Sequence, residues 1–195
     1  MAMSWNGVSF SFHVRSGTIS KYTYALATMA DVDAINAIME RTNKEIASDD
    51  VFVMDDKDFI THHIERQGFI VTVTHHDEII AFLLVRFPKQ DDDNLGRDAQ
   101  VDDDELHHVA HIESLAVVPK HRGNRLQYKM IHYAEKIIKQ RGLKYSMATV
   151  SPKNKYSLIN FLKHDFRIVK IKRKYSGVRR LILKKQHKDR KEGSQ

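Results

Sequence analysis

The chain contains no cysteine among its 195 residues. A disulfide framework and a thiol nucleophile are therefore both excluded. Long apolar runs are lacking too, and none approaches the roughly 18 consecutive residues that a membrane-spanning helix needs. Residues 1–17 also lack the apolar stretch that is typical of a secretory signal. From these absences we expect a cytoplasmic protein without a membrane partner.

What is present is typical of a globular domain. Apolar residues make up 42% of the chain and charged residues 29%, and this length usually forms one domain with a substantial core. We expect residues 21–185 to form that domain. Residues 1–20 would be an N-terminal extension, in which 8–12 alternate like a short edge strand, and residues 186–195 a basic, disordered tail.

Charge is distributed unevenly along the chain, whose formal net charge is +7. Residues 91–105 carry eight acidic side chains and one arginine, whereas the chain after residue 163 is rich in lysine and arginine. The acidic run has two interpretations: a solvated loop, or a surface that attracts cationic amines. No known nucleic-acid-binding pattern accompanies the basic residues, so we do not expect a nucleic-acid partner.

Hydrophobic periodicity predicts alternating strands and helices. We expect helices at 31–39, 56–67, 125–140 and 154–163, and strands at 69–75, 78–87, 107–118, 144–150, 166–175 and 179–183. A long polar loop, residues 89–105, would separate the second of these strands from the third. This order indicates a mixed α/β sheet flanked by helices.

A basic turn follows the strand that ends near Val118. In the sequence Arg122-Gly123-Asn124-Arg125-Leu126-Gln127, the glycine allows a close bend of the backbone. The first amides of the helix that follows have no partners within the helix, and they lie at the positive end of its dipole. The turn is therefore a candidate anion site.

This turn and its surroundings resemble the GNAT superfamily of acetyl-CoA-dependent N-acetyltransferases. The signature of that family is Gln or Arg, two residues, Gly, one residue, then Gly or Ala. Arg122 matches the first position, whereas Arg125 and Gln127 stand at the two small positions.

Two further segments carry the resemblance. Residues 26–38 are similar to the first strand and helix of the family. Farther along, Asn154, Ser157 and Phe166 match its later helix, where Phe161 replaces the usual tyrosine.

The resemblance implies a single-domain, mostly antiparallel mixed sheet whose fourth and fifth strands, at 107–118 and 144–150, splay apart. Acetyl-CoA would be the acyl donor and would lie in that gap. Its pantetheine arm would bond to the backbone of Leu115, Ala116 and Val117, and Asn154 would meet the arm from the other side. The pyrophosphate would lie in the turn formed by Arg122, Gly123, Asn124, Arg125, Leu126 and Gln127. Arg125 would adopt helical backbone angles and add a charged hydrogen bond.

Acyl transfer to an amine requires removal of a proton, because a lysine-like amine has a pKa of about 10.4. His107, His111 and Glu113 share one face of the strand by alternation. We expect Glu113 to act as general base, directly or through water. Phe161 cannot protonate the departing thiolate, so Tyr156 is a weak candidate for the general acid, with ordinary packing as its alternative role.

The same three side chains suggest a metal site only at first sight. Each two-residue step along a strand spans roughly 6.6 Å, which spreads His107, His111 and Glu113 too far for one small ion. We therefore expect no metal.

Two functions remain open from the sequence. The first is transfer of an acetyl or short acyl group from acetyl-CoA to a primary amine by direct attack in a ternary complex, since no residue is placed to form an acyl-enzyme. The alternative is a non-catalytic acyl-CoA-binding or sensor module, suggested by Phe161 and the irregular turn. The acceptor could be a small molecule or a protein amine, and both a monomer and a homodimer remain open.

Overall fold

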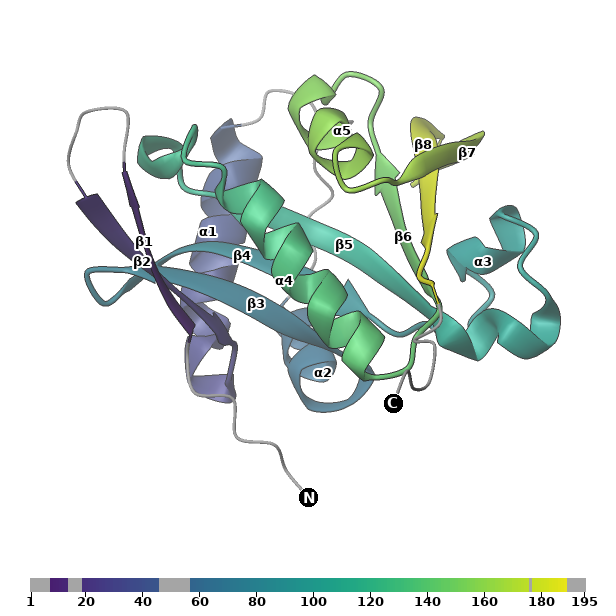
Figure 1. Ribbon diagram of the computed structural model, residues 1–195, viewed down its shortest axis with the longest axis horizontal. Helices are drawn as coiled ribbons and strands as arrows, with labels where there is room; N and C mark the ends of the chain where they lie inside the picture. Colours follow the sequence, from purple (N-terminus) through teal and green to yellow (C-terminus); the bar gives the residue numbers. More distant parts are fainter. Residues whose placement is uncertain (1–7, 14–18, 46–56, 176, 189–195) are drawn as a thin grey trace, which may run out of the picture.

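The computed structural model describes residues 8–13, 19–45, 57–175 and 177–188. These residues form one eight-stranded sheet in the order β1-β2-β3-β4-β5-β6-β8-β7 (Figure 1). All neighbouring pairs are antiparallel except β5 and β6, which are parallel. The strands are β1 (Val8–His13), β2 (Ile19–Leu26), β3 (Gly68–His75), β4 (Glu78–Arg86), β5 (Val109–Val117), β6 (Tyr145–Val150), β7 (Arg167–Lys174) and β8 (Val178–Gln186). The mixed, mostly antiparallel α/β sheet expected from the sequence is confirmed.

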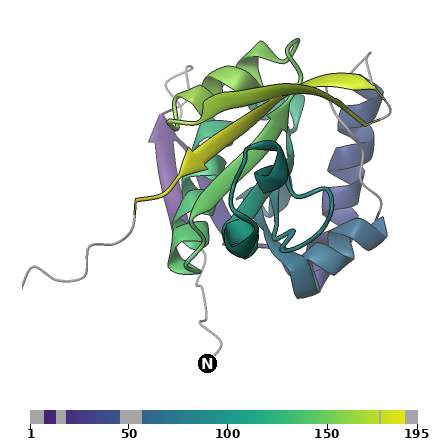
Figure 2. The ribbon, with the colours of Figure 1, turned by 90° about the vertical axis from the view of Figure 1, so that its right-hand side faces the viewer.

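Helices cover both faces of this sheet. They are α1 (Val32–Glu45), α2 (Lys57–His62), α3 (Leu95–Asp98), α4 (Leu126–Gln140) and α5 (Lys155–Leu162). A π-helical turn, His63–Gln67, continues α2, and 3-10 turns lie at Met29–Asp31, Asp103–His108 and Pro119–His121. Figure 2 shows α1 and α2 on one side of the sheet and α4 on the other. Within the described residues, no helix is both long and apolar enough to cross a membrane.

The core lies against the middle strands. Every residue from 80 to 85 on β4 is fully buried, because α1 covers one face of the strand and α4 the other. A strand that is covered on both faces reads as a continuous apolar run rather than an alternation. The helices contribute fully buried side chains at Ile35, Met39, Met130, Ile131, Ala134 and Ile138.

The parallel strands β5 and β6 separate along their length. They pair from Val109 with Tyr145 to Ile112 with Ala148, and no pairing continues beyond that point. On the other side of β5, a bulge interrupts the register with β4 between Ile112 and Leu115. A bulge bends its strand and increases its twist. The splay implied by the resemblance is therefore confirmed, and the bulge gives its physical cause.

The start of β5 differs from the prediction. We expected a strand over 107–118, but His107 and His108 end a 3-10 helix and the strand begins at Val109. The interpretation that His107 shares a face with His111 and Glu113 is therefore wrong. His111 and Glu113 do lie side by side, since their side chains are hydrogen bonded.

The segment 89–105, which we call the acidic loop, is folded rather than a plain polar connection. It contains α3 and the beginning of a 3-10 helix. Three apolar side chains within or just after it, Leu95, Val101 and Leu106, join a second small core with β6 and β8. Apolar residues spaced among the carboxylates therefore anchor the loop to the sheet.

Described structure is present on both sides of residues 21–185, and the limits of the domain stay a prediction. Residues 8–13 pair with β2 as an edge strand, while residues 1–7 and 14–18 lie outside the described part. At the other end, β8 runs to Gln186, and His187 is buried with its ring bonded to Ser146 at 2.7 Å. Ordered structure thus includes the start of the expected tail, of which residues 189–195 lie outside the described part.

A buried ion network joins α4, the end of α5 and β8. His164 donates from Nδ1 to Glu135 Oε2 at 3.1 Å and from Nε2 to the carbonyl of Tyr128 at 2.8 Å. Both ring nitrogens of His164 thus have an acceptor within hydrogen-bond distance. Lys185 pairs with the other oxygen of Glu135. Burial favours a raised pKa of Glu135, but the hydrogen bonds from His164 and Lys185 outweigh it and lower that pKa.

We expect Glu135→Gln to reduce the free energy of unfolding at pH 7 by about 3–5 kcal/mol, because it removes the buried anion that pairs with Lys185 and His164. Folding lowers the pKa of Glu135. Its contribution is therefore complete above the unfolded-state value of about 4.3 and is lost as pH falls through the lower folded-state pKa. Urea unfolding at several pH values should show the difference narrowing in acid.

The matched control is Glu40→Gln on the exposed face of α1, where Glu40 accepts a hydrogen bond from Asn36. That variant should change stability by less than about 0.5 kcal/mol. Equal stability of the two variants at pH 7 would contradict the role of the network.

Candidate active site

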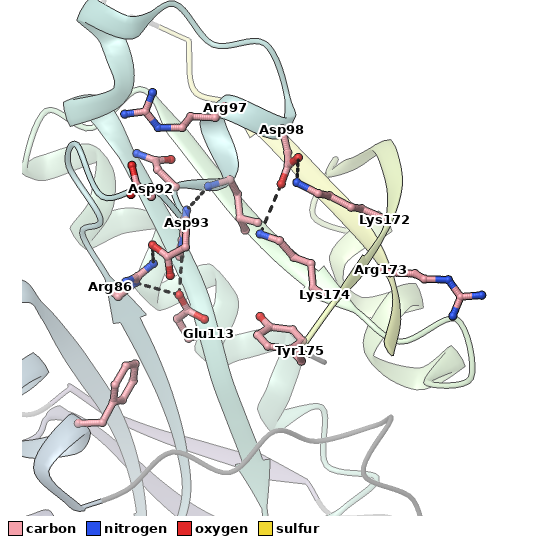
Figure 3. Close-up of a pocket in the computed structure, with 14 residues that line it drawn as sticks. Arg86, Asp92, Asp93, Arg97, Asp98, Glu113, Lys172, Arg173, Lys174 and Tyr175 are labelled. Carbon is pink, nitrogen blue, oxygen red and sulfur yellow. Dashed lines mark hydrogen bonds and ion pairs between the residues drawn. The ribbon is translucent and has the colours of Figure 1, made fainter. Parts of the chain in front are cut away.

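A cavity of about 620 Å³ opens beside the point where β5 and β6 part. Helix α2, strands β4, β5 and β7, and the acidic loop form its walls (Figure 3). The lining residues are Phe59, Arg86, Asp92, Asp93, Asn94, Leu95, Arg97, Asp98, His111, Glu113, Lys172, Arg173, Lys174 and Tyr175.

Glu113 is held by a relay of hydrogen bonds from the acidic loop. Its Oε1 accepts bonds from Arg86 Nε and His111 Nδ1, both at 3.1 Å. His111 Nε2 in turn accepts the backbone N–H of Leu95 at 3.0 Å. A backbone N–H can only donate, so Nε2 carries no proton and Nδ1 does. His111 therefore donates from Nδ1 and orients the carboxylate.

These contacts also set the charge of Glu113. Burial by itself raises the pKa of the carboxyl, but the hydrogen bond from His111 and the positive charge of Arg86 outweigh it and lower the pKa to about 2. The side chain is 22% exposed, on the side that lines the cavity. Glu113 is thus a permanent carboxylate that binds cations well, but it is a weak base towards an amine of pKa about 10.4.

His63 lies in the same neighbourhood. Its Nδ1 donates to the carbonyl of Phe59 at 2.6 Å, and its ring stacks on that of Phe59 at 4.0 Å. The other nitrogen, Nε2, is buried and has no hydrogen-bond partner among the residues that the structure describes. Burial and the charge of Arg86 lower the pKa of His63, while its bond to Phe59 opposes this. The imidazole is therefore neutral near pH 7, with a lone pair on Nε2.

The sequence contained a signal for His63 that we did not use. It lies with Phe59 and Ile60 on the apolar side of the predicted helix over 56–67. A histidine on a buried face needs partners for both ring nitrogens, and within the described part of the chain Nδ1 has one and Nε2 has none.

Most carboxylates of the acidic loop form ion pairs within the chain. Asp91 and Asp93 pair with Arg86 at 3.5 and 2.7 Å, and Asp98 pairs with three lysines of β7. Asp103 pairs with Arg97, and Glu105 with Lys144. The loop is therefore not a simple solvated run, because most of its carboxylates have a basic partner, and Asp91 and Asp93 share one, Arg86.

The gap between β5 and β6 leaves backbone groups of β5 without a neighbouring strand. Val118 N–H bonds Ile80 O at 2.9 Å, so by alternation the peptide groups of Ala116 also face β4, and those of Leu115 and Val117 face the gap. That these two residues bond an extended ligand stays a prediction.

The basic turn has the close bend that the sequence predicts, with one correction. Gly123 has φ +83° and Arg125 has φ +59°, both in the left-handed region. Our expectation that Arg125 is helical is therefore wrong, since this position favours glycine. The side chain of Arg125 makes no capping hydrogen bond to α4 within the described residues. The backbone N–H groups of Leu126 and Gln127, at the start of the helix, therefore remain available to a ligand.

The side chain of Arg122 is tied to its own chain. Its Nε donates to the carbonyl of Val117 at 3.0 Å, and its guanidinium pairs with Glu45 of α1 at 3.3 Å. Asn124 donates to the carbonyl of His121 at 3.0 Å. These bonds fix the turn against the end of β5 and against α1.

The two helix starts that border the gap are joined to each other. Asn154 caps α5 by accepting the N–H of Ser157 at 3.0 Å, and Gln127 on α4 donates to Ser157 Oγ at 3.1 Å. The expectation that Asn154 meets the pantetheine arm stays a prediction, and its Oδ1 is already bonded to the N–H of Ser157.

The tyrosine candidates separate clearly. Tyr156 is 85% exposed on α5 and does not line the cavity, and Phe161 is buried against Phe166. Tyr175, which the sequence analysis missed, does line the cavity, and its hydroxyl bonds Thr149 Oγ1 on the separated part of β6 at 3.2 Å. No spacing rule connects residue 175 with residue 113, so only the fold could identify it.

Among the described residues, no three His, Asp or Glu side chains gather in a geometry that could hold a metal ion. His107 lies on the 3-10 helix before β5, away from the face of Glu113.

Comparison with known proteins agrees with this geometry. The sequence model of the acetyltransferase (GNAT) family matches residues 33–166. The chain belongs to the GNAT acetyltransferase family. No curated protein sequence matches it significantly.

Solved structures of other GNAT enzymes share the fold at low sequence identity. The ribosomal-protein-S18-alanine N-acetyltransferase of Escherichia coli has a TM-score of 0.63 and 14% identity, over 85% of this chain and 93% of that one. The ribosomal-protein-S5-alanine acetyltransferase of Vibrio fischeri has a TM-score of 0.64 and 16% identity, over 93% and 98%. A protein of Salmonella typhimurium whose structure was solved with its cofactor acetyl-CoA has a TM-score of 0.65 and 14% identity, over 87% and 96%.

We expect Arg125→Gly to raise the free energy of unfolding by about 1 kcal/mol, because it removes a side chain from a left-handed position. The opposite change is Gly123→Ala at φ +83°, where an added Cβ would meet nothing within 4 Å. Any loss of stability there is conformational, and we expect about 1 kcal/mol. Thermal unfolding measures both, and a destabilised Arg125→Gly would show that its side chain matters more than its backbone strain.

Proposed function

We propose that this protein transfers an acetyl, or another short acyl, group from acetyl-CoA to a primary amine by direct attack in a ternary complex. One observation carries the proposal: β5 and β6 part after Ile112, and the next residue on β5 is the carboxylate Glu113. Membership of the GNAT family supports acyl transfer. A donor in the gap and an amine in the cavity would meet beside Glu113.

The gap suits the extended arm of acetyl-CoA. Pantetheine has two amide groups, and the outward peptide groups of Leu115 and Val117 can bond them as a neighbouring strand would. The amides at the start of α4, together with Gly123, would hold the pyrophosphate. The guanidinium of Arg125, beside the ring of Tyr128 at 5.4 Å, would add a charged contact.

The reaction forms a bond between the amine nitrogen and the thioester carbonyl carbon, and breaks the bond between that carbon and sulfur. The amine must lose a proton. In our proposal Glu113 binds the amine and acts as general base through water. Because its pKa is about 2, the proton does not stay on Glu113 but passes on to water.

The departing thiolate takes up a proton as CoA leaves. Phe161 cannot provide it, and Tyr156 lies outside the cavity. We propose Tyr175 as the proton donor, because its hydroxyl is hydrogen bonded to Thr149, which lies on the part of β6 that has separated from β5. A free thiol has a pKa near 8.5, so this help accelerates the reaction without being essential.

A non-catalytic acyl-CoA-binding role is the second candidate. The buried Phe161 in place of a tyrosine favours it, as does the left-handed Arg125 in the turn. Tight binding of acetyl-CoA without release of CoA in the presence of any amine would support this role over the enzyme.

Glu113→Gln tests the base. We expect it to lower kcat/KM by about 10²–10⁴-fold, measured as release of the CoA thiol with a panel of amines. The affinity for acetyl-CoA, measured by calorimetry, should equal that of the unchanged protein. Glu113 lies outside the segment from Leu115 to Val117, whose peptide groups would bond the pantetheine arm. Glu40→Gln is the control on α1, and unchanged turnover in Glu113→Gln would remove the role.

Tyr175→Phe and Tyr156→Phe form a matched pair for the acid. We expect the first to lower kcat by about 10²-fold, in the range of general-acid effects. The second should stay within about twofold, because its side chain is exposed outside the cavity. Single-turnover measurement of thiol release reports both, and the reverse ranking would restore Tyr156 as the candidate.

A further inference from the structure

The acidic loop contributes to two walls of the cavity that have opposite charge (Figure 3). Near β5, one guanidinium is surrounded by three carboxylates. Near β7, one carboxylate is surrounded by three ammonium groups. The two arrangements mirror each other, and each leaves charge that its own members do not neutralise.

The anionic wall is centred on Arg86, whose side chain is only 11% exposed. Its guanidinium pairs with Asp93 at 2.7 Å, Glu113 at 3.1 Å and Asp91 at 3.5 Å. Three carboxylates against one cation leave two negative charges, and Asp92 also lines this side. A ligand cation would find compensation there.

The cationic wall is centred on Asp98, whose side chain is 9% exposed. Lys172 approaches it at 2.7 Å, Lys170 at 3.2 Å and Lys174 at 3.4 Å. These lysines alternate along β7, so they share one face of the strand and converge. Burial alone would raise the pKa of Asp98, but the bonds from Lys172 and Lys170 lower it. The carboxylate is therefore ionised, and two positive charges exceed it.

Other lining charges do not cancel this separation. Arg97 pairs with Asp103 at 3.2 Å and with the carbonyl of Gln90, within the loop. Arg173 donates to the carbonyl of Gly177 and extends away from Asp98 in Figure 3. Lys172 and Lys174 remain as the cationic side chains of β7 that face the cavity beside Asp98.

We propose that the amine acceptor is a small molecule that also carries an anionic group, a carboxylate or a phosphate, at the end away from its amine. The ammonium lies at Glu113 and Asp93, and the anion at Lys172 and Lys174. This inference rests on the proposed acyl transfer. The cavity volume of about 620 Å³ is in the range of small-molecule sites, about 300–1,000 Å³.

The same charges select against other amines. A polyamine would place its second cation against the lysines of β7, and a plain alkylamine would leave their surplus charge without a partner. Like-charge contact and unpaired charge both reduce affinity. The discrimination therefore depends on Lys172 and Lys174, while the chemistry depends on Glu113.

The test compares amines in matched pairs that differ in one anionic group. The pairs are 6-aminohexanoate with hexylamine, 4-aminobutanoate with butylamine, and O-phosphoethanolamine with ethanolamine, and putrescine represents the polyamines. We expect kcat/KM for the anionic member to exceed that of its neutral partner by at least about tenfold, with putrescine as the poorest acceptor. The pairs also show whether carboxylate or phosphate is preferred.

The variants are Lys172→Met and Lys174→Met, with Lys172→Arg to restore the charge. Each methionine variant should reduce the preference for the anionic amine at least fivefold, mainly through KM, and the arginine variant should retain it. Arg167→Met is the matched control, because Arg167 is an exposed cation on the same strand outside the cavity. Its preference should be unchanged.

A binding experiment separates this inference from the proposed function. Calorimetric titration of 6-aminohexanoate and O-phosphoethanolamine into the protein with CoA present requires no turnover. Binding that weakens in Lys172→Met supports the inference even if no amine is acylated. Transfer with equal efficiency to both members of every pair overturns it and leaves the acyltransferase intact. The inference is also overturned if no anionic amine is either acylated or bound. A preference for a peptide N-terminus over all small amines would overturn it too.

Discussion

The parting of β5 from β6 is the constraint on which the rest of the structure depends. The bulge between Ile112 and Leu115 adds a residue to β5 relative to β4, and a strand with an extra residue must bend. The bend ends the pairing with β6 at Ala148. It leaves peptide groups of β5 facing an open gap, and Glu113 stands at the start of that gap. The bulge in β5 thus accounts both for the gap in which the acyl donor would bind and for the position of Glu113 beside that gap.

Three charged side chains with little solvent exposure are each surrounded by groups of opposite charge. Glu135 is held between His164 and Lys185, Arg86 lies among carboxylates, and Asp98 lies among lysines. Each group would be costly to bury alone, so each brings its counter-ions with it. Of these three networks, the one around Glu135 is buried in the core. The other two line the cavity, where the surplus negative charge around Arg86 and the surplus positive charge around Asp98 can attract oppositely charged groups of a ligand.

Element order and the splay could be predicted from the sequence because they follow from periodicity and from short motifs. Local geometry could not. Arg125 reads as an ordinary helix residue, and only the closure of the turn forces it to φ +59°. His107 fits the alternation of a strand in the sequence. In the structure it lies in a 3-10 helix that precedes β5, and the neighbouring Leu106 packs in the second small core. Tyr175 and His63 come to the site through contacts between elements far apart in the chain, for which no spacing exists.

The sequence by itself determined the family, the sheet with its gap, the turn before α4 and the candidacy of Glu113. These depend on neighbours along the chain, where glycine, alternation and helix starts act locally. Tertiary structure alone decided what surrounds Glu113. The acidic run and the basic strand β7 are separate features of the sequence, and only folding brings Asp98 beneath three lysines and Asp93 onto Arg86. Charge pairing acts through space and not along the chain, so the character of the cavity is a property of the fold.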